Sequence, residues 1–179
     1  QIDIVLQPIK NRRKNILLAD MDSTMIEQEC IDELADEAGV GKRVAEITKR
    51  AMNGELNFED ALIERVKLLK GLSSDIIVNV LKGRITLMPG AESLIKTMKR
   101  NGSYCALVSG GFTDFTEAIS KILGFDENRA NTLLQKNKIL TGEVQFPILG
   151  RQAKVEALTD ITKKLGCAHN DVIAVGDGA

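Results

Sequence analysis

The chain has 179 residues, of which 44% are hydrophobic, and its 24 basic and 25 acidic side chains leave a net charge of -1. This balance argues against binding to nucleic acid or to an anionic membrane. No apolar run approaches the ~20 residues of a membrane span, and the N-terminus has no signal-peptide pattern. The length suits one domain, or one domain that carries an insertion.

Cysteine and histidine are too few for several kinds of chemistry. Cys30, Cys105 and Cys167 lie far apart and form no CxxC motif, which favours buried thiols over a disulfide or a zinc site. We therefore expect a reducing, cytoplasmic location. His169 is the only histidine, so a site that needs two histidines in one chain is excluded. The chemistry must rest on carboxylates, hydroxyls, Lys and Arg.

The first half of the chain changes its periodicity once. Residues 1–14 are predicted to be a linker or an edge strand, and the apolar residues 15–20 are typical of a buried strand. From Ile26 to Ala38 apolar residues recur every fourth position, which predicts a helix. Further helices are expected over 44–51, after the cap residue Asn57, and after Ser73 or Ser74. No strand is needed within residues 26–86, which we interpret as a small helical subdomain.

Strands and helices alternate after residue 86. The pattern predicts a helix from Pro89-Gly90, a strand over 104–108, helices over 113–123 and 151–165, and a strand over 172–175. Residues 131–146 are predicted to be a two-stranded excursion.

This alternation predicts the α/β class: a Rossmann-like, mostly parallel sheet flanked by helices, with right-handed crossovers. Segments 15–25 and 87–179 would form this core domain, and 26–86 would be inserted after its first strand. The sequence stops where a further helix and strand would follow, so we expect the C-terminal end of the core to be missing.

Polar residues stand where the predicted strands end. Asp20 and Asp22 follow the first strand, Ser109 follows the next, Asp177 follows the last, and Lys154 lies near a helix start. Carboxyl ends of parallel strands share one edge, where ligands bind in open α/β sheets. Carboxylates beside a hydroxyl and an ammonium suit a phosphate group bound with a divalent cation such as Mg²⁺.

Each of these motifs also has an ordinary structural interpretation. An Asp-x-Asp pair is often a turn or a helix cap, Ser-Gly-Gly and Gly-Asp-Gly are common turns, and a helical Lys is usually a surface charge. Their joint placement favours a site. The residues alone leave an enzyme and a nucleotide- or metal-binding module as equal alternatives.

Four segments resemble, in order, the motifs of the haloacid dehalogenase-like superfamily in its phosphatase form. They are Asp20-Met21-Asp22-Ser23-Thr24, Ser109-Gly110-Gly111-Phe112, Lys154 in Gln152-Ala153-Lys154-Val155, and Gly176-Asp177-Gly178-Ala179. The similarity runs from about residue 15 onward and is greatest to the phosphoserine phosphatases. The predicted helical subdomain matches their cap in position, and Glu29, Met52, Phe58 and Arg65 match cap residues.

The resemblance implies hydrolysis of O-phosphoserine, the last step of serine biosynthesis, through an aspartyl-phosphate. Asp20 is the implied nucleophile, and Asp22 is the implied acid and base. The implied Mg²⁺ ligands are Asp20, the backbone carbonyl of Asp22, and Asp177. Ser109, Gly110 and Lys154 are implied to hold the phosphoryl group.

The cap residues have implied roles in reading the substrate. Glu29 would pair with its ammonium group and Arg65 with its carboxylate, while Met52 and Phe58 would shield the site from water. Alternatively, Glu29 belongs to a solvated acidic helix face, Arg65 pairs with neighbours on its helix, and Met52 and Phe58 are core residues.

Other functions stay open at this point. One is a phosphatase of the same superfamily for another small monoester such as phosphohomoserine, and another is a phospho-accepting regulatory domain. The oligomeric state is also open, a homodimer included. Superfamily members continue the fourth motif with Asn-Asp, which contributes to metal and phosphate binding. We therefore expect the chain ending at Ala179 to bind Mg²⁺ weakly and to show little turnover.

Overall fold

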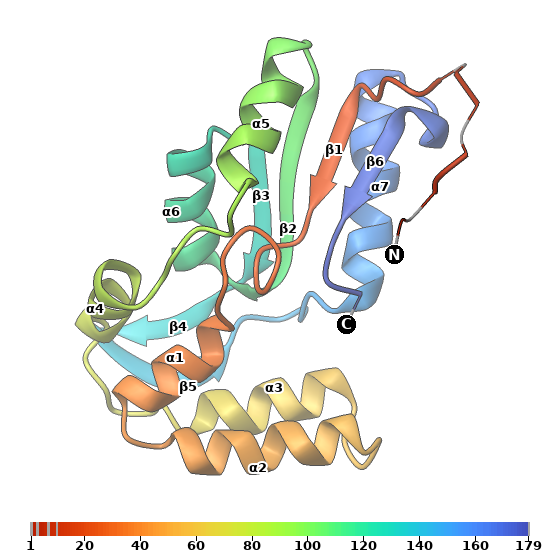
Figure 1. Cartoon of the computed structure of the whole chain (residues 1–179). Helices are drawn as coiled ribbons and strands as arrows, with labels where there is room; N and C mark the ends of the chain where they lie inside the picture. The colour runs from red at the N-terminus through yellow and green to blue at the C-terminus, as the bar shows by residue number, and fades with distance from the viewer. Residues whose placement is uncertain (1, 3, 7, 10, 179) are drawn as a thin grey trace.

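The computed structural model describes residues 2, 4–6, 8, 9 and 11–178, and its centre is a parallel sheet (Figure 1). The strand order is β3-β2-β1-β6, and every neighbouring pair is parallel. The predicted α/β class is therefore confirmed. The strands are β1 (Ile16–Ala19), β2 (Tyr104–Phe112), β3 (Glu127–Asn131) and β6 (Val172–Val175).

Helices cover both faces of the sheet. In Figure 1, α5 (Ala91–Arg100) and α6 (Thr113–Leu123) lie on one side, and α7 (Arg151–Leu165) lies on the other. Leu17 and Ala19 of β1 belong to the apolar cluster beneath α5 and α6, whereas Ile16 and Leu18 belong to the cluster beneath α7. Because both faces are covered, β1 is an uninterrupted apolar run.

A helical subdomain lies beyond the carboxyl ends of the strands (Figure 1). It comprises α1 (Cys30–Glu37), α2 (Gly41–Met52), α3 (Phe58–Lys67) and α4 (Asp75–Gly83). The Asn57 side chain accepts a hydrogen bond from the Asp60 backbone at 2.8 Å, which confirms Asn57 as the cap of α3. The helix expected from Ile26 begins later, at Cys30, because Ile26 forms an antiparallel bridge with Leu87 instead.

The segment predicted as a two-stranded excursion over 131–146 needs a correction. Its first residue, Asn131, ends β3 in the central sheet, and the hairpin consists of β4 (Leu133–Lys136) and β5 (Ile139–Val144). The sequence did not indicate β3 because this strand lies at the edge of the sheet and begins with polar residues, Glu127-Asn128-Arg129.

The hairpin is attached to the helical subdomain rather than to the sheet. The Leu140 N–H donates to the Leu72 carbonyl, and the Gly71 N–H donates to the Leu140 carbonyl, both at 2.9 Å. Gly142, at φ 78°, packs so closely that an added Cβ would lie 2.7 Å from Lys70 Cβ. The helices that follow β1 are thus held by a segment from the second half of the chain.

The structure also bears on the predictions for the N-terminal segment, the cysteines and membrane-spanning helices. Residues 2, 4–6, 8, 9 and 11–14 form no strand, which favours the linker interpretation over an edge strand; residues 1, 3, 7 and 10 lie outside the described part. Cys30 and Cys105 are buried free thiols, and Cys167 is a half-buried one. A short 3-10 turn, η1 (His169–Asp171), precedes β6. None of the helices in the described ranges is long and apolar enough to cross a membrane.

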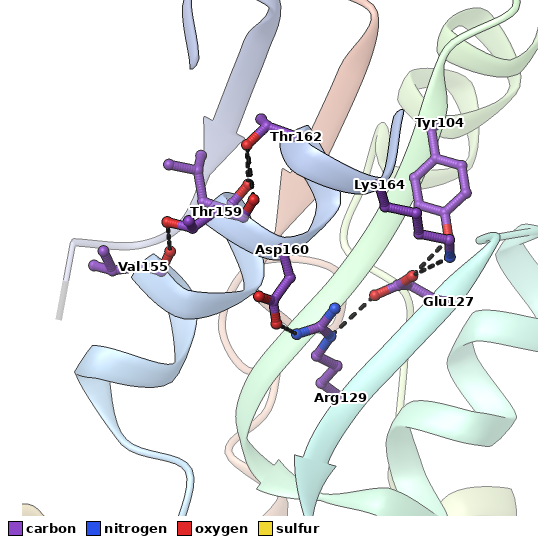
Figure 2. Close-up of polar contacts among 9 residues, drawn as sticks. Tyr104, Glu127, Arg129, Val155, Thr159, Asp160, Thr162 and Lys164 are labelled. Carbon is purple, nitrogen blue, oxygen red and sulfur yellow. Dashed lines mark hydrogen bonds and ion pairs between the residues drawn. The ribbon is translucent and has the colours of Figure 1, made fainter. Parts of the chain in front are cut away.

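A polar network connects α7 to the sheet, next to the small apolar cluster beneath this helix (Figure 2). Glu127 accepts hydrogen bonds from Tyr104 at 2.6 Å, Arg129 at 3.0 Å and Lys164 at 3.2 Å. Arg129 also forms an ion pair with Asp160 of α7 at 3.0 Å. Two cations and two carboxylates therefore join β3 to α7 over its second half.

The network predicts a specific acid sensitivity. Burial alone would raise the pKa of Glu127, but the bonds from Tyr104, Lys164 and Arg129 outweigh it and lower this pKa. The unfolded chain thus binds this proton more readily, so the stabilisation is complete at neutral pH and is lost as the pH falls through the folded pKa. Between about pH 5 and about pH 3, we expect the free energy of unfolding to fall less steeply for Glu127→Gln than for the unmodified protein. Denaturant titrations at several pH values give the slope of the unfolding free energy against pH for each protein. Equal slopes for Glu127→Gln and the unmodified protein contradict the prediction. The control is Glu117→Gln, at an exposed position.

Candidate active site

Asp20 stands directly after β1 and is held from several sides. Its N–H donates to the Val175 carbonyl of β6 at 3.0 Å, and its Oδ1 accepts the Met21 N–H at 2.8 Å. Its Oδ2 forms an ion pair with Nζ of Lys154, from the first turn of α7. Because the Asp20 side chain is only 13% exposed, its carboxylate is fixed at the sheet edge with a cation beside it.

Asp22 lies two residues further along the same loop and faces different partners. Its Oδ1 accepts the Cys30 N–H at 2.9 Å, and its Oδ2 accepts the Ser109 hydroxyl at 3.1 Å. Burial raises the pKa of Asp22, the bonds from Cys30 and Ser109 oppose the rise, and the negative charge of Asp20 adds to it. Asp22 therefore holds a proton more readily than an exposed aspartate does.

The Ser109-Gly110-Gly111 segment lies within a strand rather than after one. β2 continues to Phe112, but its register with β3 shifts between Val108 and Phe112. Ser109 is buried, and its hydroxyl accepts the Gly111 N–H at 2.9 Å. A Cβ on Gly111 would lie 2.5 Å from Asp22 Oδ2, so only glycine lets these two segments approach so closely.

Asp177 lines the same cavity as Asp20 and Lys154, a space of about 280 Å³ between the ends of β1, β6 and α7. Within the described ranges, no three His, Cys, Asp or Glu side chains gather as a metal-binding group. Mg²⁺ needs less, because one or two carboxylates suffice and waters complete its octahedral coordination. Two carboxylates that border one cavity provide the oxygen donors that Mg²⁺ prefers, so these residues fit that ion.

Glu29 lies next to the site loop at the start of the helical subdomain, and Arg65 belongs to α3 of the same subdomain. Glu29 accepts the Ser23 hydroxyl at 2.7 Å; desolvation raises its pKa, this bond opposes the rise, and the charges of Asp22, Asp32 and Asp177 add to it. Arg65 donates from Nε to the Ala61 carbonyl of its own helix at 3.2 Å.

Two acidic side chains lie near Arg65. Burial lowers the pKa of Arg65, and the negative charges of Asp32 and Glu29 oppose that change. The Arg65 guanidinium thus lies in an acidic environment within the helical subdomain, to which Asp32 contributes more than Glu29.

Met52 and Phe58 are not core residues, so that alternative is wrong for both. Met52 is 83% exposed at the end of α2, and Phe58 is 42% exposed at the start of α3. The Phe58 ring lies over two glycines of the core: an added Cβ would come within 2.9 Å of it at Gly110 and 3.2 Å at Gly150. Phe58 therefore brings the helical subdomain into contact with the Gly110 and Gly150 segments of the core.

Asn131 is a site-supporting residue that sequence reasoning missed. It is 2% exposed, and its Nδ2 donates to the Gly110 carbonyl at 2.8 Å and to the Leu149 carbonyl at 3.1 Å. Its Oδ1 accepts the Leu149 N–H at 2.7 Å. One side chain thus joins the Ser109-Gly110 segment to the chain that leads into Lys154's helix. Its strand, β3, carried no periodic signal that would have indicated this position.

The chain is similar in sequence to known proteins. The family model described as haloacid dehalogenase-like hydrolase matches residues 17–179. The chain belongs to this family. A phosphoserine phosphatase of Archaeoglobus fulgidus is 44% identical over 180 residues, 99% of this chain and 52% of that protein. One of Methanocaldococcus jannaschii is 46% identical over 168 residues, 94% of this chain and 79% of that protein. The chain spans about half the length of some curated relatives that it matches.

Solved structures of this haloacid dehalogenase-like family agree with the fold. One, described as a phospho-aspartyl intermediate analogue of phosphoserine phosphatase, has a TM-score of 0.83 and 44% identity, covering 91% of this chain and 78% of that one. Another, described as a substrate-bound phosphoserine phosphatase complex, has the same TM-score and identity. The sheet with its flanking helices is therefore the family's fold.

Proposed function

We propose that this protein is a phosphomonoesterase that hydrolyses O-phosphoserine to serine and phosphate. The observation that carries the proposal is the pairing at the edge of the sheet. One short loop brings Asp20 to Lys154, 134 residues away, and Asp22 to Ser109, 87 residues away. Curated relatives named phosphoserine phosphatase, and a solved relative described as a phospho-aspartyl intermediate analogue, support the substrate and the covalent route.

The two carboxylates have separate duties in this proposal. An Asp20 carboxylate oxygen attacks the phosphorus and forms an aspartyl-phosphate, while the bond from phosphorus to the seryl oxygen breaks. Asp22 gives its proton to that leaving oxygen, and then accepts a proton from the water that attacks the aspartyl-phosphate. The raised pKa of Asp22 suits the first of these roles.

The phosphoryl group is held by residues already close to these carboxylates. Lys154 supplies positive charge, and Ser109 and the Gly110 backbone supply hydrogen-bond donors. Asp20, Asp177 and the backbone carbonyl of Asp22 would bind Mg²⁺, which when bound neutralises negative charge on phosphoryl oxygens.

The helical subdomain, residues 26–86, acts as a cap over the core formed by 15–25 and 87–179. Glu29 would read the substrate ammonium group, and Arg65 would read its carboxylate through a planar, two-pronged contact. Phe58 and Met52 would limit the access of water when the cap is closed. A cytoplasmic location in serine biosynthesis belongs to the same proposal.

Replacing Arg65 with alanine tests the proposed substrate. We expect kcat/KM for O-phosphoserine to fall about 10- to 100-fold, because a charge-assisted contact to the carboxylate is lost. Activity on O-phosphoethanolamine, which keeps the ammonium group but has no carboxylate, should change less than about threefold. Phosphate release by the full-length protein with Mg²⁺ measures both.

The control is Arg50→Ala, which removes an exposed arginine that pairs with Glu64 within the helical subdomain. In this variant, kcat/KM should stay nearly unchanged for both substrates. Equal losses on the two substrates in Arg65→Ala would contradict carboxylate reading, and a wild-type preference for a monoester without a carboxylate would contradict phosphoserine as the substrate.

A further inference from the structure

Two linkers join the helical subdomain to the core, and they form a ribbon. The chain enters along residues 20–29 and leaves along residues 84–90. Ile26 and Leu87 form an antiparallel bridge, and the Met88 N–H donates to the Met25 carbonyl at 3.0 Å. The linkers are therefore paired through their backbones, although Gln28 of one and Thr86 of the other lie 58 residues apart in the chain.

Side chains reinforce this ribbon at one residue, Thr86. Its N–H donates to Gln28 Oε1 at 2.9 Å, and its hydroxyl accepts from Gln28 Nε2 at 2.7 Å. The same hydroxyl donates to Glu27 Oε2 at 2.6 Å, and the Thr86 carbonyl accepts the Glu27 N–H at 3.0 Å. All three polar atoms of Thr86 are thus engaged by two consecutive residues of the entering linker.

Gln28 connects this contact to the substrate-facing part of the loop. Its carbonyl accepts the Ser23 N–H at 3.2 Å, and the Ser23 hydroxyl donates to Glu29, the next residue, at 2.7 Å. Ser23 has a φ of 51°, a left-handed conformation that a non-glycine residue keeps only where its surroundings hold it. The orientation of Glu29 therefore depends on Ser23, and that of Ser23 depends on Gln28.

We propose that Gln28 and Thr86 are positioning residues for Glu29, and that their side-chain contact sets how strongly the protein prefers substrates with an ammonium group. This inference rests on the proposed function. Neither side chain touches the Asp20–Lys154 pair, so both act through the loop that presents Glu29.

The contact is suited to orientation more than to folding. Without the Thr86 hydroxyl, the backbone bonds between Glu27 and Thr86 and between Met88 and Met25 remain. Thr86 is also exposed. Removing its hydroxyl therefore does not leave a buried polar atom of residue 86 without a hydrogen-bond partner. The loss should therefore change where Glu29 points while the linkers stay paired.

Thr86→Val tests this proposal, since valine keeps the shape and removes the hydroxyl. The measured quantity is the ratio of kcat/KM for O-phosphoserine to kcat/KM for 3-phosphoglycerate, which carries a hydroxyl in place of the ammonium group. We expect the ratio to fall about two- to tenfold, which corresponds to one lost hydrogen bond. Thr86→Ser, which restores the hydroxyl, should keep the wild-type ratio.

A double-mutant cycle with Glu29→Gln shows whether the effect passes through Glu29. Thr86→Val should lower the ratio no further once Glu29 is neutral. An unchanged ratio in Thr86→Val, an equal loss on both substrates, or a full second loss in the double variant each overturns the proposal.

Amide hydrogen exchange provides a readout that needs no turnover. The Ser23 amide, which donates to Gln28, should exchange faster in Thr86→Val and at the wild-type rate in Thr86→Ser. Unchanged exchange in Thr86→Val overturns the positioning role. If the wild-type protein releases no phosphate from O-phosphoserine, the proposed function and the ammonium preference both fail, and exchange still decides whether the contact orders the loop.

Discussion

Asp20→Asn is expected to lower kcat for O-phosphoserine by at least about a thousandfold, because an amide cannot take the place of the attacking carboxylate. The KM should change far less, since Ser109, Gly110 and Lys154 remain to bind the phosphoryl group. Single-turnover experiments with acid quenching should recover a phosphorylated protein from the wild type and none from the variant.

Asp160→Asn is the matched control for this substitution. Like Asp20, Asp160 is an aspartate that pairs with a cation. It lies on α7 and pairs with Arg129, away from Asp20. Its kcat should stay within about twofold of the wild type. An Asp20→Asn variant that keeps more than about a tenth of wild-type turnover would exclude Asp20 as the nucleophile.

Gly111→Ala should have the next largest effect. The new methyl group would lie 2.5 Å from Asp22 Oδ2 and 3.1 Å from the Ser109 hydroxyl, so both side chains must move. Displacing an acid by even 1 Å misaligns proton transfer, and we expect kcat to fall about 100-fold. Overpacking should also cost about 1–3 kcal/mol of unfolding free energy, measurable by denaturant titration.

Gly83→Ala separates the local effect from the general cost of adding a methyl group. A Cβ at Gly83, the last residue of α4, meets no atom within 4 Å. This variant should match the wild type in turnover. If Gly111→Ala keeps turnover within about threefold of the wild type, the close approach of Gly111 to Asp22 is irrelevant to the chemistry.

The fold could be predicted from the sequence wherever one physical signal dominated. β1 is buried on both faces, so its apolar run was clear, and Asn57 capped α3 as its position indicated. β3 was missed because a polar edge strand lacks that signal. The start of α1 was misplaced because the bridge from Ile26 to Leu87 is a long-range pairing, which overrides the local period.

The sequence indicated which of the candidate residues gather at the sheet edge, but not the contacts that they make there. The strand-end positions of Asp20, Asp22 and Asp177 follow from the parallel sheet. The pairing of Asp20 with Lys154, and of Asp22 with Ser109, depends on loop geometry that no periodicity encodes. Asn131 escaped notice for the same reason, since its contacts are with backbone atoms of distant segments.

The position of β1 between β2 and β6 has a consequence for how the chain acquires its structure. Ile16 pairs with Tyr104 on one side and with Val172 on the other, so β1 is synthesised before both of its neighbours, and β2 before β6. Contacts between such distant residues slow folding, because the loop between them must close first. During synthesis, β1 would present one open edge to other chains until β6 leaves the ribosome. The Asp20 amide, which bonds to Val175 of β6, would find its native partner only after β6 has been made.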